Sequence, residues 1–308
     1  MTDIAKLVIG KIEKLNVYRH GDRRAPHKPL LLLIALSELI CGRRELPYDE
    51  VEERLLPLLR SYAPPVKARH QPELPYWHLQ TDELWSVQGA DHLPRTSGGF
   101  PAKAALRATS AGFPKAIADA LLADKLLAAK VIDMLLYEHF PPSVHDDLLA
   151  QVGLADFDDQ SIAEPREAYE KVRRRDPAFR EKVLRAYEHR CAVTGFRAAL
   201  GGSYFGCEAA HFQWHAYDGP DTVANGICVE PTLHKLLDAG AWTLTDDRRI
   251  LVSQDYTGSS SAISRLRDFH GQTLRSPLPG EQYVSEEYIR WHREPELGGV
   301  FRGPHLPL

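Results

Sequence analysis

Residues 208–240 read EAAHFQWHAYDGPDTVANGICVEPTLHKLLDAG and carry the clearest structural pattern of the C-terminal half. It opens with a short apolar strand that ends in His211 and continues through a loop rich in Gly, Asp and Pro to an Asn-Gly pair at Asn225. A second short strand follows, and then a helix that carries His234 and Asp238. This order of periodic segments and turn residues predicts a ββα unit.

The polar residues of this unit have the chemistry that phosphodiester hydrolysis needs. That reaction requires a base to activate water, a cation to stabilise charge on the phosphate, and a group that holds the base in place. His211 is the predicted base, and the amide of Asn225 is predicted to tie the loop closed. His234 and Asp238 stand at i and i+4 on one helix face, where they can grip one ion. We therefore expect a divalent metal cofactor, Mg²⁺ or Mn²⁺.

The motif resembles that of the HNH endonuclease family. The resemblance covers about Tyr187 to Val252. It implies a metal-dependent DNA endonuclease of the ββα-metal fold, with His211, Asn225 and His234 as catalytic residues and His234 and Asp238 as metal ligands. Ala210 stands where many relatives carry an Asp or His ligand, so water and substrate phosphate would complete the metal shell. The matching residues are Ala209-Ala210-His211, Asn225-Gly226 and His234-x-x-x-Asp238-Ala239-Gly240.

The cysteines do not form the spacing of a disulfide framework or of a zinc site. HNH relatives often carry two Cys-x-x-Cys knuckles, whereas this chain has Cys191-x-x-Thr194 and isolated Cys41, Cys207 and Cys228. We therefore expect no structural zinc and no disulfides, and the pattern favours a reducing cytoplasm.

Length and composition indicate two folded domains. Single cores rarely exceed roughly 250 residues, and this chain has 308, with 44% hydrophobic and 26% charged residues. The net charge of −4 gives no global sign of nucleic-acid binding, but only the contact surface needs to be basic. We predict an α+β protein with a mainly helical domain over 1–155, a linker over 156–175 and the nuclease domain over 176–308. No apolar run approaches the roughly 20 residues that span a bilayer, so we expect no membrane association.

Three helices are predicted in the N-terminal half. The run PLLLLIALSELICG predicts a buried helix from Pro29 to the stop at Gly42. Amphipathic patterns predict further helices over about 49–60 and 114–137. Between them, residues 72–87 read PELPYWHLQTDELWSV, which we interpret as one or two short strands and turns.

A basic segment directly precedes the buried helix. Residues 19–28 read RHGDRRAPHK, with four Lys or Arg against one Asp. Such a loop can grip a DNA backbone and approach the base edges.

The segments APHKPLLLL, ELPYWHLQTDELW and GGFPAKAAL resemble the sulfur-binding domain of phosphorothioate-dependent restriction endonucleases, over about residues 10–150. Sulfur is larger and less hydrated than oxygen, so a small apolar pocket rimmed by cations can favour it. Pro75 and Tyr76 could equally be core residues, and relatives commonly have an aromatic at the position of Leu74 and Arg at that of Lys28. The resemblance implies a pocket walled by Leu74, Pro75 and Tyr76, with His27 and Lys28 on the modified phosphate and Arg19, Arg23, Arg24 and Lys103 on the flanking DNA.

Together these features predict a type IV restriction endonuclease that binds phosphorothioate-modified double-stranded DNA and cuts nearby. One alternative is an HNH endonuclease specific for methylated cytosine, for which a cage of several aromatics around a flipped base would be needed. The other is a non-catalytic DNA-binding protein with an inactive HNH fold. The sequence leaves the oligomeric state open, a homodimer being one option.

Overall fold

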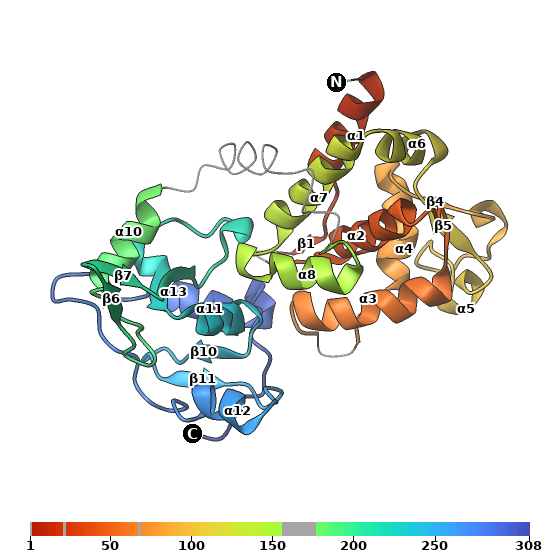
Figure 1. The fold of residues 1–308 in the computed structure, drawn as a ribbon. Coiled ribbons are helices and arrows are strands. Elements are labelled where there is room, and N and C mark those ends of the chain that lie inside the picture. Colours follow the sequence, from red (N-terminus) through yellow and green to blue (C-terminus); the bar gives the residue numbers. More distant parts are fainter. Residues whose placement is uncertain (1, 21–22, 67–68, 156–176) are drawn as a thin grey trace. The chain divides into compact units, whose positions relative to one another are not determined.

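A computed structural model describes residues 2–20, 23–66, 69–155 and 177–308, without the side chains of residues 19, 20, 23, 24 and 177 (Figure 1). The chain divides into two compact units. One comprises Met1–Arg19 and Ala25–Val172, and the other comprises His20–Arg24 and Arg173–Leu308. The predicted linker over 156–175 lies outside the described residues. None of the helices in the described ranges is both long and apolar enough to cross a membrane.

The first unit is mainly helical, as predicted. Its strands are short, and three of them form a small antiparallel sheet in the order β3-β5-β4. The helices are α1 (Asp3–Glu13), α2 (His27–Ile40), α3 (Tyr48–Tyr62), α4 (Glu73–His78), α5 (Lys103–Leu106), α6 (Lys115–Ala123), α7 (Lys125–His139) and α8 (His145–Val152), and the strands are β3 (Leu46–Pro47), β4 (Ser86–Val87) and β5 (Ser110–Gly112). Strand β1 (Arg19–His20) begins at the last residue of the segment Met1–Arg19, and β2 (Arg23–Arg24) belongs to the second unit.

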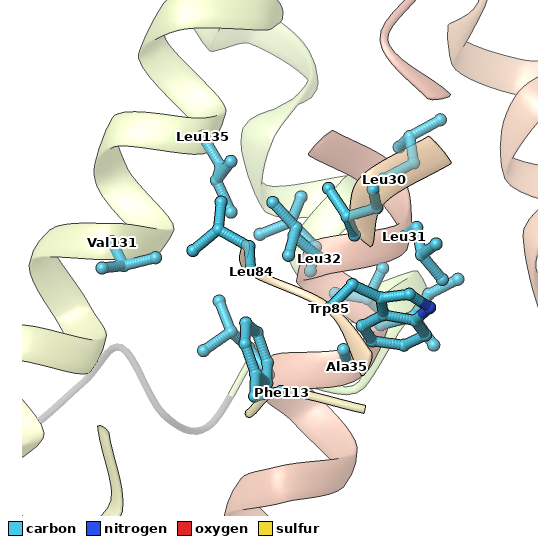
Figure 2. Close-up of a cluster of buried hydrophobic side chains, with 14 of the residues drawn as sticks. Leu30, Leu31, Leu32, Ala35, Leu84, Trp85, Phe113, Val131 and Leu135 are labelled. Carbon is cyan, nitrogen blue, oxygen red and sulfur yellow. The ribbon is translucent and has the colours of Figure 1, made fainter. Parts of the chain in front are cut away.

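Helix α2 is the centre of this unit. Because it is apolar on nearly every side, it is covered all round, by α3, α4, α7 and α8 among others. Leu30, Leu31 and Leu32 have no exposed surface. Figure 2 shows these leucines among Trp85 and other side chains from distant segments. The predicted buried helix is therefore confirmed, although it begins at His27, before Pro29.

The single helix predicted over 114–137 is wrong. The structure has two helices, α6 and α7, that meet at Asp124. Asp124 has an extended backbone, and its carboxylate accepts the Leu127 backbone N–H at 3.0 Å. This N-cap bond satisfies a donor that a continuing helix would have bonded internally, so the chain starts a new helix there.

The strands predicted over 72–87 are mostly wrong as well. Residues 73–78 form α4, a one-and-a-half-turn helix, and only Ser86–Val87 forms a strand. Pro72 caps the helix and Pro75 lies in its first turn. The first-turn N–H groups have no helical partner, so proline is tolerated there and does not argue against a helix.

The second unit combines small antiparallel sheets with helices, as predicted for a ββα-containing domain. Strands β8 and β9 pair antiparallel, and α11 follows directly. Its elements are α10 (Pro177–Ala186), β6 (Ala198–Leu200), β7 (Ser203–Phe205), β8 (Glu208–His211), β9 (Gly226–Val229), α11 (Pro231–Asp238), β10 (Trp242–Leu244), β11 (Ile250–Val252), α12 (Ser260–Arg267) and α13 (Glu286–Arg293).

Candidate functional site

The strand pair β8–β9 positions the predicted base. His211 is the last residue of β8 and pairs with Gly226, the first residue of β9. A Cβ at position 226 would lie 2.5 Å from the Val183 side chain and 3.0 Å from that of Phe179, both on α10. Glycine is thus required there because a helix approaches closely, and the Asn-Gly pair starts a strand instead of forming a hairpin turn.

His211 is held from two directions. Its Nε2 lies 2.9 Å from Oδ1 of Asp221, in the loop between the two strands. Its ring stacks on Phe179 with centroids 4.0 Å apart and an interplanar angle of 14°. A carboxylate that accepts from Nε2 places the ring proton on that nitrogen. The lone pair is then on Nδ1, which is the nitrogen left to accept a proton.

Asn225 closes the loop as the sequence predicted. Its side chain is completely buried. The amide Nδ2 donates to the carbonyls of Gln213 and Pro220, each at 3.0 Å, and Oδ1 accepts the Gln213 backbone N–H at 2.8 Å. These three bonds fix the backbone just after the predicted base His211, and Asn225 does so without touching the His211 side chain.

The structure brings His234 and Asp238 together. His234 Nε2 lies 3.2 Å from Oδ2 of Asp238, and its Nδ1 lies 2.8 Å from Oε2 of Glu208. Burial opposes a charge on His234, but the Asp238 and Glu208 carboxylates outweigh burial and raise its pKa to about 9. The bond with His234 in turn lowers the pKa of Glu208. Positive charge is therefore strongly favoured between these two carboxylates.

This arrangement fits a divalent cation bound through two protein ligands. Two cis ligands of a six-coordinate cation lie about 3 Å apart, close to the separation of His234 Nε2 and Asp238 Oδ2. Glu208 would then accept from Nδ1 and orient the ring. Across the described ranges, no three or more His, Cys, Asp or Glu side chains are grouped to hold a metal ion. Ala210, fully buried, offers no ligand, so the expectation of a partly water-filled metal shell stays.

Sequence reasoning missed Asp221, Phe179 and the role of Glu208. Asp221 lies in a loop where Asp is common for turn formation, so nothing in its spacing marked it. Glu208 precedes His211 by three residues on β8, and its bond to His234 depends on how α11 packs against that strand. No hydrogen bond or ring contact among the described residues joins His211 directly to His234.

The predicted apolar wall of the reader domain lies mostly in the core. Tyr76 has no exposed surface; its ring packs edge-on against Tyr48 and Trp85, and its hydroxyl is 3.0 Å from that of Thr109. A ligand on the surface cannot reach Tyr76 in this structure, because core packing places it inside. Pro75 is also buried, whereas Leu74 is partly exposed.

The predicted cationic residues have carboxylate neighbours. Lys28 Nζ lies 2.5 Å from Asp82, with both side chains largely buried, and Lys103 pairs with Glu52. His27 is partly buried and its ring meets that of His70 edge-on at 5.8 Å. Arg19, Arg23 and Arg24 belong to β1 and β2, but their side chains lie outside the described residues.

Two known families match the chain, one in each half. The ScoMcrA-like, DNA sulfur-binding domain family matches residues 5–157, and the HNH endonuclease family matches residues 191–245. No curated protein matches.

Solved structures also resemble the chain. The sulfur binding domain of ScoMcrA complexed with phosphorothioated DNA is 25% identical, with a TM-score of 0.44, and the match covers 51% of this chain and 98% of that one. The type IV phosphorothioation-dependent restriction endonuclease ScoMcrA is 24% identical, with a TM-score of 0.43. That match covers 54% of this chain and 35% of ScoMcrA. The modification dependent TagI restriction endonuclease is 23% identical, with a TM-score of 0.29. That match covers 39% of this chain and 37% of TagI. The chain thus spans little more than a third of the length of these two enzymes. The two family matches, in the same order as the two compact units, show that this chain carries a ScoMcrA-like DNA sulfur-binding domain followed by an HNH endonuclease domain.

Proposed function

We propose that this protein is a type IV restriction endonuclease that binds phosphorothioate-modified double-stranded DNA with its N-terminal domain and hydrolyses a nearby phosphodiester bond with its HNH domain. The observation that carries the nuclease assignment is the contact between His211 and Asp221, on a strand end held by Asn225. The predicted base, the carboxylate that orients it and the amide that holds its loop are all in place, which is the arrangement that general-base catalysis needs.

The reaction follows from the positions of these side chains. Asp221 holds the proton on Nε2 of His211, so Nδ1 takes a proton from the attacking water. The water oxygen forms a new bond to phosphorus while the bond to the leaving oxygen breaks. As His211 becomes positively charged, the Asp221 carboxylate stabilises it.

The divalent cation, when bound, neutralises charge on the phosphate and on the leaving oxygen. His234 and Asp238 would hold it, and Glu208 would fix the His234 ring. We expect the metal to be Mg²⁺ or Mn²⁺, because most ligands in its coordination shell would be carboxylate and water oxygens. The four cysteines are free, which supports a reducing compartment such as the cytoplasm.

The N-terminal domain would select the modified linkage. Leu74 offers apolar surface beside the buried Pro75. His27 and Lys28 would approach the modified phosphate, and Arg19, Arg23, Arg24 and Lys103 the flanking strands. Lys28 and Lys103 already form ion pairs with carboxylates, so each would have to contact DNA phosphate and its carboxylate partner at the same time.

The test uses the full chain and three matched duplexes carrying a normal, a cytosine-methylated or a phosphorothioate linkage. We expect the phosphorothioate duplex to be bound most tightly and to be the one that is cleaved, with weak binding to the other two. His211→Ala should lower cleavage at least about a hundredfold and leave binding unchanged. His305→Ala, at an exposed imidazole of the same unit, serves as the matched control and should leave both unchanged. Preference for the methylated duplex would replace the reader assignment, and binding without cleavage at any divalent metal would show an inactive HNH fold.

A further inference from the structure

A second two-stranded hairpin of the HNH domain has no assigned role. Strands β6 and β7 pair with each other only, within the part of the chain that the structure describes. The register is Leu200 opposite Ser203 and Ala198 opposite Phe205. Gly201 and Gly202 close the hairpin with φ values of 58° and 85°, the positive values that a tight two-residue turn with the sheet's twist requires.

One face of this hairpin is apolar and unpacked. Alternation along the strands puts Leu200 and Phe205 on the same face. Leu200 is 78% exposed and Phe205 is 54% exposed. Isolated exposed apolar residues are ordinary, but two large ones together on a free ribbon indicate a binding surface.

The opposite face carries a stacked ring and one cation. The His189 ring stacks on Tyr204 at 4.5 Å, and the Arg197 guanidinium lies 4.6 Å from the Tyr204 ring centre. Arg197 also donates to the Tyr204 hydroxyl at 2.5 Å. These contacts preorganise the hairpin, so little conformational entropy would be lost on binding.

Further cations gather at the base of the hairpin. Arg275 packs its guanidinium against Gly195, where a Cβ would lie 2.8 Å from Nε, and Arg190 contacts the Gly195 carbonyl at 3.5 Å. Both arginines line a surface cavity of about 200 Å³, which Glu188 also lines. Residues 189–207 contain no Asp or Glu, in a chain that has 42. This charge pattern fits a polyanion.

The hairpin is also directly continuous with the nuclease site. Strand β7 ends at Phe205, and β8, which carries His211, begins at Glu208. Two residues, Gly206 and Cys207, thus separate the hairpin from the strand that ends in the predicted base.

We propose that the β6–β7 hairpin enters the minor groove of the DNA beside the cleaved bond, with Leu200 and Phe205 wedged against the bases and Arg190, Arg197 and Arg275 on the flanking phosphates. Apolar side chains that enter the minor groove partly unstack a base step and bend the duplex. The hairpin would thus set where the cut falls relative to the domain that reads the modification. This inference rests on the proposed function, because it takes DNA as the substrate.

The test is base unstacking, measured with 2-aminopurine placed at successive positions in a phosphorothioate duplex. His211→Ala protein keeps the DNA intact, and its binding should raise the fluorescence at one step several-fold. Adding Leu200→Ser and Phe205→Ser should abolish that rise while sulfur-dependent binding stays within a few-fold. Leu308→Ser, at a 71% exposed leucine of the same unit, is the matched control and should leave the rise intact.

In the His211-intact protein, the same double substitution should lower cleavage about tenfold, because the binding energy of the two inserted side chains is used to deform the duplex at the cut site and not to tighten binding. An unchanged fluorescence rise in the double variant overturns the inference. A second outcome also overturns it: the wild-type protein is a dimer, the double variant is a monomer, and fluorescence and cleavage are the same in both. The hairpin would then be an interface between copies of the chain.

Failure of the proposed function is seen separately. If the protein binds duplexes without sulfur preference, or binds and does not cut, the proposed function is wrong, yet the 2-aminopurine signal on any bound duplex still decides the role of the hairpin. A protein that binds no duplex at low salt overturns both.

Discussion

Oδ1 of Asp221 lies 2.9 Å from Nε2 of His211, so a loop carboxylate ten positions along the chain orients the predicted base. Both side chains are largely buried, at 13% and 11% exposure. A hydrogen bond of this kind selects the tautomer that can accept a proton at Nδ1.

Asp221→Asn should lower kcat about ten- to hundredfold with little change in KM or melting temperature. The amide can donate to Nε2, which would move the ring proton to Nδ1 and remove the acceptor. Steady-state kinetics and a thermal melt check this. Asp218→Asn, at an exposed residue of the same loop, is the control. Wild-type kcat in Asp221→Asn would mean that Asp221 does not act through His211.

Asn225→Ala should destabilise the HNH domain by about 3 kcal/mol, because two carbonyls and one N–H lose their buried partner. Denaturant unfolding followed by tryptophan fluorescence measures the change. Thr222→Ala, an exposed change in the same loop, should stay within about 0.5 kcal/mol. Equal effects of the two substitutions would contradict the role of Asn225 as the loop closure.

Chelation should stop cleavage without unfolding the protein. EDTA removes the cation that His234 and Asp238 would hold, whereas no structural zinc is expected at the buried Cys191, Cys207 and Cys228. Cleavage should return with Mg²⁺ or Mn²⁺. Loss of the cooperative melt in EDTA, or stoichiometric zinc after dialysis, would show that the cysteines bind metal.

In the reader domain, Leu74→Ser should erase the preference for sulfur over oxygen while weak binding to any duplex remains. Arg24→Ala should weaken binding to both duplexes alike and reduce the salt slope by about one unit. Tyr76→Phe removes only the hydroxyl next to Thr109 and should keep the preference. Salt titrations on paired duplexes that differ by one sulfur measure all three. A folded Leu74→Ser variant with wild-type preference would place the sulfur pocket elsewhere.

The HNH domain should lose stability as the pH falls from about 6.5 to 4. Burial lowers the pKa of His292 to about 4, from an ordinary value of 6.5. Below pH 6.5 the unfolded chain therefore binds a proton that the folded chain does not, and the loss reaches about 3 kcal/mol at pH 4. Denaturant unfolding at several pH values measures it. His292→Gln, which keeps a donor for the Leu237 carbonyl but does not titrate, should flatten this dependence; an identical slope in both proteins would exclude His292 as its source.

Local features of the sequence were sufficient for the ββα unit and for the buried helix. His211, Asn225, His234 and Asp238 lie within 28 consecutive residues, so strand, loop and helix periodicity alone places them on the right elements. Helix α2 was equally visible, because a segment that is apolar on all sides must be covered on all sides.

Tertiary structure decided what depends on contacts between elements. Asp221 faces His211 because of the conformation of the loop that Asn225 closes. The spacing of residues in the sequence does not predict that conformation. Tyr76 is inside because Tyr48 and Trp85 surround it, although the resemblance to sulfur-binding domains implied a pocket wall at that position. Sequence patterns report the local backbone and which face is apolar, whereas side-chain contacts depend on how distant segments pack, and only the folded chain specifies that.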